Sequence, residues 1–217
     1  MRVPGAGLAE RLRTATRAEH EAAEQSPFIV ALLDGRLDRE CYARLLGQSW
    51  LFYRVLEQAG RSWRADPVAG AFVFDELHRC DPLEADLRWL YGLRWRDRVE
   101  PLPATRRYMD RLRSVCFTST SAFVAHHYTR YIGDLSGGQI IRRKLASAYG
   151  LTTDGVRFYL FDGIGAPKRF KDAYRRLLDQ APWTAAEQDD LVAEANEAFR
   201  LNRAVFCDLA DAVGLCQ

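Results

Sequence analysis

YTRYIGDLSGGQIIRRKLA, residues 128–146, is the most informative stretch of this 217-residue sequence. Its flanks have the periodicity of one long helix, yet Gly133, Gly137 and Gly138 fall inside that helix. A glycine in a helix interior costs about 1 kcal/mol relative to alanine, so three of them cost about 3 kcal/mol. A group that approaches this bare backbone closely should compensate for that cost, and either a flat ligand or a neighbouring helix would do so.

A phosphate-binding loop explains these glycines poorly, because the segment lacks a terminal Gly-Lys-Ser/Thr and no β-strand precedes it. A ridge for helix packing is the simpler alternative, since Gly133 and Gly137 are four residues apart. Arg130 and Asp134 argue for more than a ridge. They lie on one helical face beside the glycines, so a carboxylate would overlook whatever the backbone touches. As an ordinary i,i+4 ion pair they would need no ligand at all.

Helical periodicity continues outward through nearly the whole chain, and strand-like alternation is absent, which predicts an all-α fold. No repeat, low-complexity tract or linker divides the sequence, so we expect a single domain over residues 1–217. The expected helices cover about 8–24, 38–63, 66–77, 82–91, 104–117, 119–148, 168–180 and 184–213.

Two of these helices have clear starting signals. Asp81 precedes a proline and an acidic residue, as expected of an N-cap, and Thr184 with Glu187 fits a capping box. The segment 151–167 contains three glycines and a closing proline around the apolar run Phe-Tyr-Leu-Phe at 158–161. We expect a packed connecting loop there, with aromatic side chains that wall a pocket.

The composition limits the classes of partner. The chain has 31 Lys and Arg against 29 Asp and Glu, a net charge of +2, which gives no electrostatic reason to expect nucleic acid or an anionic membrane. No apolar run approaches the ~20 residues of a spanning helix, so we expect no membrane anchor. Five cysteines without CxxC, CxxCH or zinc spacing indicate a reducing, cytoplasmic compartment; they are Cys41, Cys80, Cys116, Cys207 and Cys216.

The segment 128–139 resembles the signature of the haem oxygenase family, and the likeness extends from Leu12 to about Leu209. The resemblance implies a multi-helical haem oxygenase-like fold in which haem is sandwiched between an N-terminal proximal helix and the glycine-containing distal helix. It also implies the activity, which is cleavage of haem b at the α-meso carbon by O2 and electrons. The products are biliverdin IXα, Fe2+ and CO, so haem is both substrate and cofactor.

His20 is the proximal iron ligand by this resemblance. On the residues alone, a single histidine at the border of a helical apolar stripe is more commonly a hydrogen-bonded structural residue. Glu24 follows one turn later and is expected to hydrogen-bond the other ring nitrogen. His78, His126 and His127 match no ligand role and are expected to be packing or surface residues.

The haem propionates need cations at the mouth of the pocket. The resemblance places Arg13, Tyr128, Lys171 and Arg175 around them, although ordinary charges of amphipathic helices would look the same. Arg13 stands where relatives often have lysine.

The distal side should hold a water network in place of a second protein ligand. Asp134 resembles the essential distal aspartate, which acts through water on iron-bound O2, and Arg130, Tyr53 and Asn202 match the residues that hold this network. Without the resemblance, Tyr53 and Asn202 would pass as ordinary helix residues. A neutral histidine opposite this water favours attack of the terminal oxygen on a meso carbon over cleavage of the O–O bond.

Four further residues are assigned to the distal wall: Gly133, Gly137, Phe199 and Phe206. The two glycines would tilt bound O2 toward one edge of the ring. Because the sequence has no flavin, nicotinamide or iron–sulfur motif, electrons must come from a partner such as ferredoxin or flavodoxin with its reductase.

Two other functions are considered. A haem carrier or sensor would keep His20 but would not need Asp134 or Arg130. A helical enzyme of the thiaminase-like fold or a ferritin-like di-iron protein would bind no haem, but the sequence lacks paired Glu-x-x-His motifs and an argued cysteine nucleophile.

Overall fold

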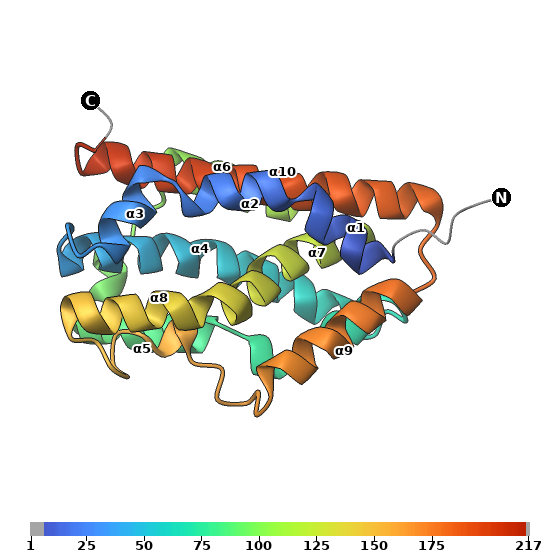
Figure 1. Ribbon diagram of the computed structural model, residues 1–217, viewed down its shortest axis with the longest axis horizontal. Helices are drawn as coiled ribbons and strands as arrows, with labels where there is room; N and C mark the ends of the chain where they lie inside the picture. Colours follow the sequence, from blue (N-terminus) through green and yellow to red (C-terminus); the bar gives the residue numbers. More distant parts are fainter. Residues whose placement is uncertain (1–6, 216–217) are drawn as a thin grey trace.

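The computed structural model describes residues 7–215, and every regular element in this range is helical, which confirms the expected all-α fold (Figure 1). The α-helices are α1 (Leu8–Ala15), α2 (Arg17–Glu24), α3 (Pro27–Leu33), α4 (Arg39–Trp63), α5 (Cys80–Tyr91), α6 (Pro103–Val115), α7 (Thr120–His127), α8 (Gly133–Tyr149), α9 (Pro167–Gln180) and α10 (Ala185–Ala212). The shorter segments are η1 (Ala69–Phe72), η2 (Asp75–Leu77), η3 (Trp95–Arg98), η4 (Tyr128–Ile132) and η5 (Arg157–Tyr159).

Helix α4 is mostly buried and packs against α5 and α6. Helix α10 packs against α7, α6 and α2, and Figure 1 shows α2 and α10 side by side along one edge of the molecule. In the same view α8 lies on the other side of α4 from α2. Two long helices therefore support the shorter ones that carry the candidate site residues.

Side-chain caps explain several helix boundaries. The Asp38 carboxylate accepts the N–H of Cys41 at 2.9 Å at the start of α4. The expected capping box of α10 is confirmed, since Thr184 and Glu187 accept each other's backbone N–H groups at 3.2 and 2.8 Å. Helix α8 ends at Gly150, whose φ of +69° is left-handed.

The expected helix 8–24 is divided at Thr16, whose hydroxyl donates to the Leu12 carbonyl at 2.8 Å and competes with the regular backbone pattern. The expected helix 119–148 is likewise divided into α7, η4 and α8, because η4 is a single π-helical stretch. Such widened turns occur often at functional sites. Helix α3 was not expected from the sequence.

The prediction of a helix over 66–77 is wrong. The Asp66 carboxylate accepts the N–H groups of Val68 and Ala69 at 2.9 and 2.7 Å, and the chain beyond it forms two 3-10 segments, η1 and η2, separated by Val73 and Phe74 in extended conformation. Asp81 as an N-cap is also wrong, because α5 begins at Cys80.

Glu57 of α4 takes over the capping role at α5. Its Oε1 accepts the N–H of Arg79 at 2.6 Å and of Cys80 at 3.0 Å. A carboxylate far away in the sequence thus sets the start of this helix.

No helix among residues 7–215 is both long and apolar enough to span a lipid bilayer. Within the same range the cysteines are free, with Cys41 and Cys116 buried and Cys207 exposed; Cys216 lies outside the described residues.

Candidate active site

The candidate site is a crevice between α2 and α8. A cavity of about 130 Å³ is lined from α2 by His20, Ala23 and Glu24, and from α8 by Gly133, Asp134, Gly137 and Ile141. Its remaining walls are Ile29, Leu45, Ser49, Thr129, Arg130, Phe158, Tyr159, Phe199, Asn202 and Phe206. A second cavity of about 240 Å³ shares four of these residues, namely His20, Thr129, Gly133 and Phe199, so the two hollows adjoin.

His20 projects from the half-exposed face of α2. Its Nδ1 lies 3.6 Å from a carboxylate oxygen of Glu24, longer than a hydrogen bond but within ion-pair range. The ring meets Phe199 of α10 edge-on, with centroids 5.4 Å apart. The Glu24 carboxylate therefore lies on the Nδ1 side of the ring without forming the expected hydrogen bond, and no described residue makes a hydrogen bond to Nε2.

Asp134 forms the centre of the polar group on the opposite helix. The Tyr53 hydroxyl of α4 donates a hydrogen bond to its Oδ2, and the Arg130 guanidinium lies 3.6 Å from the same oxygen. Burial raises the pKa of Asp134, while the charges of Arg130 and Arg79 and the Tyr53 hydroxyl act in the opposite direction. No described residue makes a hydrogen bond to Oδ1, which leaves that oxygen for a small polar ligand.

Arg130 connects α10 to this group. Its guanidinium donates to the Asn202 side chain at 2.6 Å and stacks over the Phe52 ring with a separation of 4.8 Å. The Nε of Arg130 and the Oγ1 of Thr129 are buried and have no hydrogen-bond partner among residues 7–215. Two polar atoms beside the cavity are thus available to form hydrogen bonds with a ligand.

The glycines of α8 play two different roles. A methyl group added to Gly133 or Gly137 would meet no neighbouring atom within 4 Å among the described residues. These two glycines therefore do not serve close helix packing, which excludes the ridge interpretation for them. Gly138 does serve packing, because its added Cβ would lie 3.0 Å from Cδ1 of Tyr159. The bare backbone at the first two positions faces the crevice.

Basic residues gather at the mouth of the second cavity. This cavity is lined by Arg13, Arg17, Tyr128, Ser136 and Arg175. The Lys171 ammonium donates a hydrogen bond to the Ser136 hydroxyl at 3.2 Å.

The expected cations thus meet in one place, but two are already paired. Arg13 binds Glu10 at 2.6 Å, and Arg175 binds Asp172 at 2.8 Å. Burial lowers the pKa of Lys171, and the nearby Arg175 charge adds to this effect. An anion at the mouth would relieve that repulsion.

Some lining residues were not predicted from the sequence. Arg17 could have been found from its position four residues after Arg13 and three before His20. The others are apolar or small residues without a local signal: Thr16, Ala23, Ile29, Leu45, Ser49, Thr129, Ile132, Ser136 and Ile141. The expected aromatic wall of the 151–167 loop is confirmed for Phe158 and Tyr159.

Two of the other histidines, His126 and His127, serve packing, while the partly exposed His78 lies 3.8 Å from an Asp75 carboxylate oxygen. His126 is buried, and its Nε2 lies 2.8 Å from Glu194 Oε1, while Arg111 binds the same carboxylate. His127 contacts the Tyr174 hydroxyl at 2.9 Å through Nδ1, and burial lowers the pKa of His127 to about 3. Neither faces the crevice.

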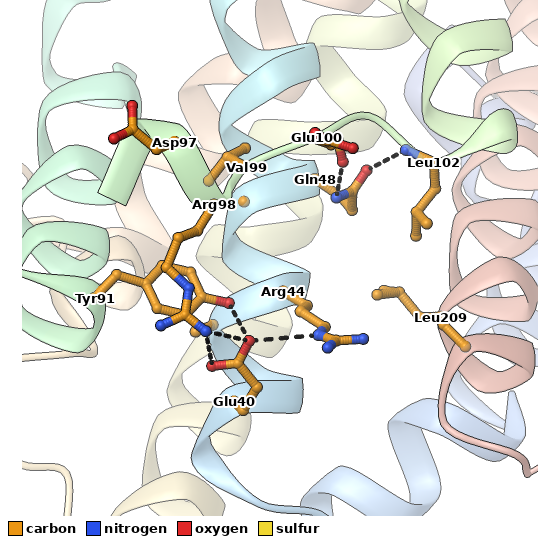
Figure 2. Close-up of a pocket in the computed structure, with 13 residues that line it drawn as sticks. Glu40, Arg44, Gln48, Tyr91, Asp97, Arg98, Val99, Glu100, Leu102 and Leu209 are labelled. Atoms are coloured by element: carbon orange, nitrogen blue, oxygen red, sulfur yellow. Dashed lines mark hydrogen bonds and ion pairs between the residues drawn. The ribbon is translucent and has the colours of Figure 1, made fainter. Parts of the chain in front are cut away.

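A larger hollow of about 450 Å³ lies between α4, η3 and α10, and Figure 2 shows two groups of its polar residues bonded to one another. Glu40 contacts Arg98 at 3.3 Å, Arg44 at 3.5 Å and the Tyr91 hydroxyl at 3.1 Å. Gln48 bonds the backbone carbonyl of Glu100 and the N–H of Leu102. These groups hold the η3–α6 connection, so this hollow is structural.

Residues 6–208 match the family model described as Heme oxygenase. Heme oxygenase 2 of Synechocystis sp. is 38% identical over 210 residues, which cover 95% of this chain and 84% of that protein. The crystal structure of the cyanobacterial heme oxygenase-1 from Synechocystis sp. in complex with heme has a TM-score of 0.90 at 36% identity and covers 97% of both chains. Heme oxygenase-2 from the same organism, in complex with heme and NO, has a TM-score of 0.91 at 37% identity, with 97% of this chain and 88% of that one covered.

Proposed function

The chain belongs to the haem oxygenase family, and we propose that it cleaves haem b at the α-meso carbon to biliverdin IXα, Fe2+ and CO. Haem binding is supported by the solved relatives that contain heme. O2 and an external electron donor are the other reactants in this proposal.

One observation carries the proposal. His20 and Asp134 come from distant parts of the chain, yet they line the same crevice, together with the bare glycines Gly133 and Gly137. A haem carrier would have no use for a buried carboxylate held by Tyr53 and Arg130. A di-iron site is disfavoured because residues 7–215 contain no cluster of three or more His, Cys, Asp or Glu side chains that could hold a metal.

The residues of the crevice fit a flat, partly apolar ligand with charged edges. The space facing Gly133 and Gly137 admits a group that a side chain at either position would displace. Phe199, Phe206 and Phe158 supply apolar walls, and the cations at the mouth can bind carboxylates. When bound, haem supplies an iron that activates O2 and the macrocycle that is oxidised.

His20 is proposed to hold the iron through Nε2. Glu24 at 3.6 Å from Nδ1 orients the ring, and the edge contact with Phe199 restricts its rotation. A haem bound here would be held by His20 on this side and would supply the iron that binds O2.

Asp134 is proposed to hold a water, and through it a proton, at Oδ1. Tyr53 and Arg130 both engage Oδ2, so they fix the carboxylate without occupying the other oxygen. Asn202 holds Arg130 in place from α10. Burial favours the protonated form of Asp134 and Arg130 favours the ionised form, and this balance suits a group that passes a proton to water.

The basic mouth is proposed to select the isomer. Lys171, Arg175 and Tyr128 would hold the propionates of a bound haem and so favour oxidation at one meso carbon. Arg13 and Arg17 lie at the same opening and add positive charge. Arg13 has to exchange its Glu10 partner for a propionate.

Electrons are proposed to come from a ferredoxin or flavodoxin with its reductase. The free cysteines of the described residues support a reducing, cytoplasmic location.

Haemin titration followed by turnover tests the function. Addition of haemin should give the Soret band of a histidine ligand, and reductant under air should then give biliverdin. Chromatography against the four isomers should identify IXα. A main product of the β or δ type would contradict the propionate assignment, and absence of biliverdin would contradict the function.

A further inference from the structure

One wall of the crevice comes from a loop and not from a long helix. Segment η5 lies between α8 and α9, and its Phe158 and Tyr159 both line the cavity opposite the apolar side chains of α10. Loops are usually mobile, yet a wall that contacts a substrate has to stay in place. Contacts from neighbouring elements must therefore hold η5.

A buried carboxylate holds its first two residues. Asp86 of α5 is fully buried, and each of its oxygens accepts a different backbone N–H, from Arg157 at 3.0 Å and from Phe158 at 2.8 Å. Burial raises the pKa of Asp86 to about 6, although these N–H groups act to lower it. Both oxygens of the carboxylate are therefore hydrogen-bonded to the backbone of the wall.

Two more side chains hold the next peptide groups. Arg79, which precedes α5, donates to the carbonyl of Phe158 at 3.1 Å and to that of Leu160 at 2.6 Å. Gln139 of α8 donates to the carbonyl of Tyr159 at 2.9 Å. Every peptide group that carries a wall residue is therefore bonded to α5, its N-cap or α8.

Gly138 sets how close the wall lies to α8. An added Cβ would be 3.0 Å from the Tyr159 ring, tighter than ordinary van der Waals contact. The wall is thus pulled toward α5 by Asp86 and seated directly on the glycine helix at Gly138.

We propose that Asp86 is a positioning residue that fixes the Phe158–Tyr159 wall and thereby the in-plane seat of haem, so that it determines how selectively one meso carbon is oxidised. This inference rests on the proposed function. It assigns to Asp86 no contact with haem; the carboxylate acts through the backbone of η5. Without the hydrogen bonds from Asp86, the wall should move and haem should bind in more than one orientation. A mixture of biliverdin isomers would reveal this.

Asp86→Asn tests the proposal. The amide can accept one N–H through its oxygen, but its NH2 group faces the other N–H donor. In the haem-free protein we expect amide hydrogen exchange at Arg157 and Phe158 to become about ten-fold faster or more, measured by NMR. In the haem-loaded protein we expect a second isomer to rise to at least about a tenth of the product.

Two further variants separate positioning from stability. Asp208→Asn is a matched control, because Asp208 also accepts a backbone N–H, that of Ala104 at 2.6 Å, but lies outside the crevice. It should leave the product unchanged. Gly138→Ala moves the wall from the other side without removing a hydrogen bond, so it should alter the isomer ratio even if Asp86→Asn folds poorly.

The outcomes are distinct. Wild-type exchange at Arg157 and Phe158 in Asp86→Asn, or an unchanged isomer in both wall variants, would overturn the proposal. An equal shift in Asp208→Asn would also overturn it, because the cause would then be general destabilisation. A wild-type protein that forms no biliverdin would instead refute the proposed function, while the exchange data would still report on the wall.

Discussion

Replacing Gly137 by alanine should separate stability from ligand binding. The added methyl group meets no neighbouring atom within 4 Å, so the helix gains the full difference in propensity, about 1 kcal/mol. For a protein of this size we expect the melting temperature of the haem-free form to rise by about 2–4 °C. The same methyl group occupies the space proposed for haem, and overpacking of about 1–3 kcal/mol should weaken haemin binding roughly ten-fold or more.

Thermal unfolding followed by circular dichroism and haemin titration followed at the Soret band measure the two effects. Gly138→Ala is the matched control, because the contact of its Cβ with Tyr159 at 3.0 Å should offset the gain in propensity. An unstabilised Gly137→Ala protein would show that the position is packed after all. A stabilised protein with unchanged haemin affinity would show that the space is not the haem site.

Three other predictions concern the charged and ligating residues. His20→Ala should abolish the histidine-ligated spectrum, and retention of that spectrum in imidazole-free buffer would refute the ligand assignment. Asp134→Asn should bind haem nearly as well as the wild type but form biliverdin about 10²–10⁴-fold more slowly, whereas turnover at the parental rate would leave Asp134 a structural residue. Against the effect of burial, hydrogen bonds from His126 and Arg111 lower the pKa of Glu194 to about 2, from the usual 4.5. The stability this carboxylate contributes is present above about pH 4.5 and is lost as the pH falls toward 2. In urea unfolding, Glu194→Gln should therefore be about 1.5–3 kcal/mol less stable than wild type at pH 7. This difference in the free energy of unfolding should shrink in acid. A difference that stays constant with pH would exclude the proposed link between Glu194 ionisation and stability.

Several features that depend on local sequence were predicted correctly. Helical periodicity, the capping box at Thr184 and the punctuated loop at 151–167 depend on residues within a few positions of one another, and the structure confirms them. One prediction from local sequence is wrong. The helix expected at 66–77 is replaced by the 3-10 segments η1 and η2, because Val73 and Phe74 between them are extended.

The site residues named from the sequence rested on a resemblance, since periodicity alone treats His20, Tyr53 and Asn202 as ordinary helix residues. The sequence by itself therefore determined the helical class and the family, together with the unusual glycines beside Arg130 and Asp134. Composition and spacing could not say whether those glycines pack against a helix or face a ligand.

Only the tertiary structure decided that question, because it depends on which atoms lie beyond the missing side chain. The space beside Gly133 and Gly137 is open, whereas Gly138 touches Tyr159. The role of Asp86 in holding the η5 wall was likewise visible only in the tertiary structure, because Asp86 contacts residues far away in the chain. Contacts between residues far apart in the chain are set by how helices pack, and no local pattern encodes them.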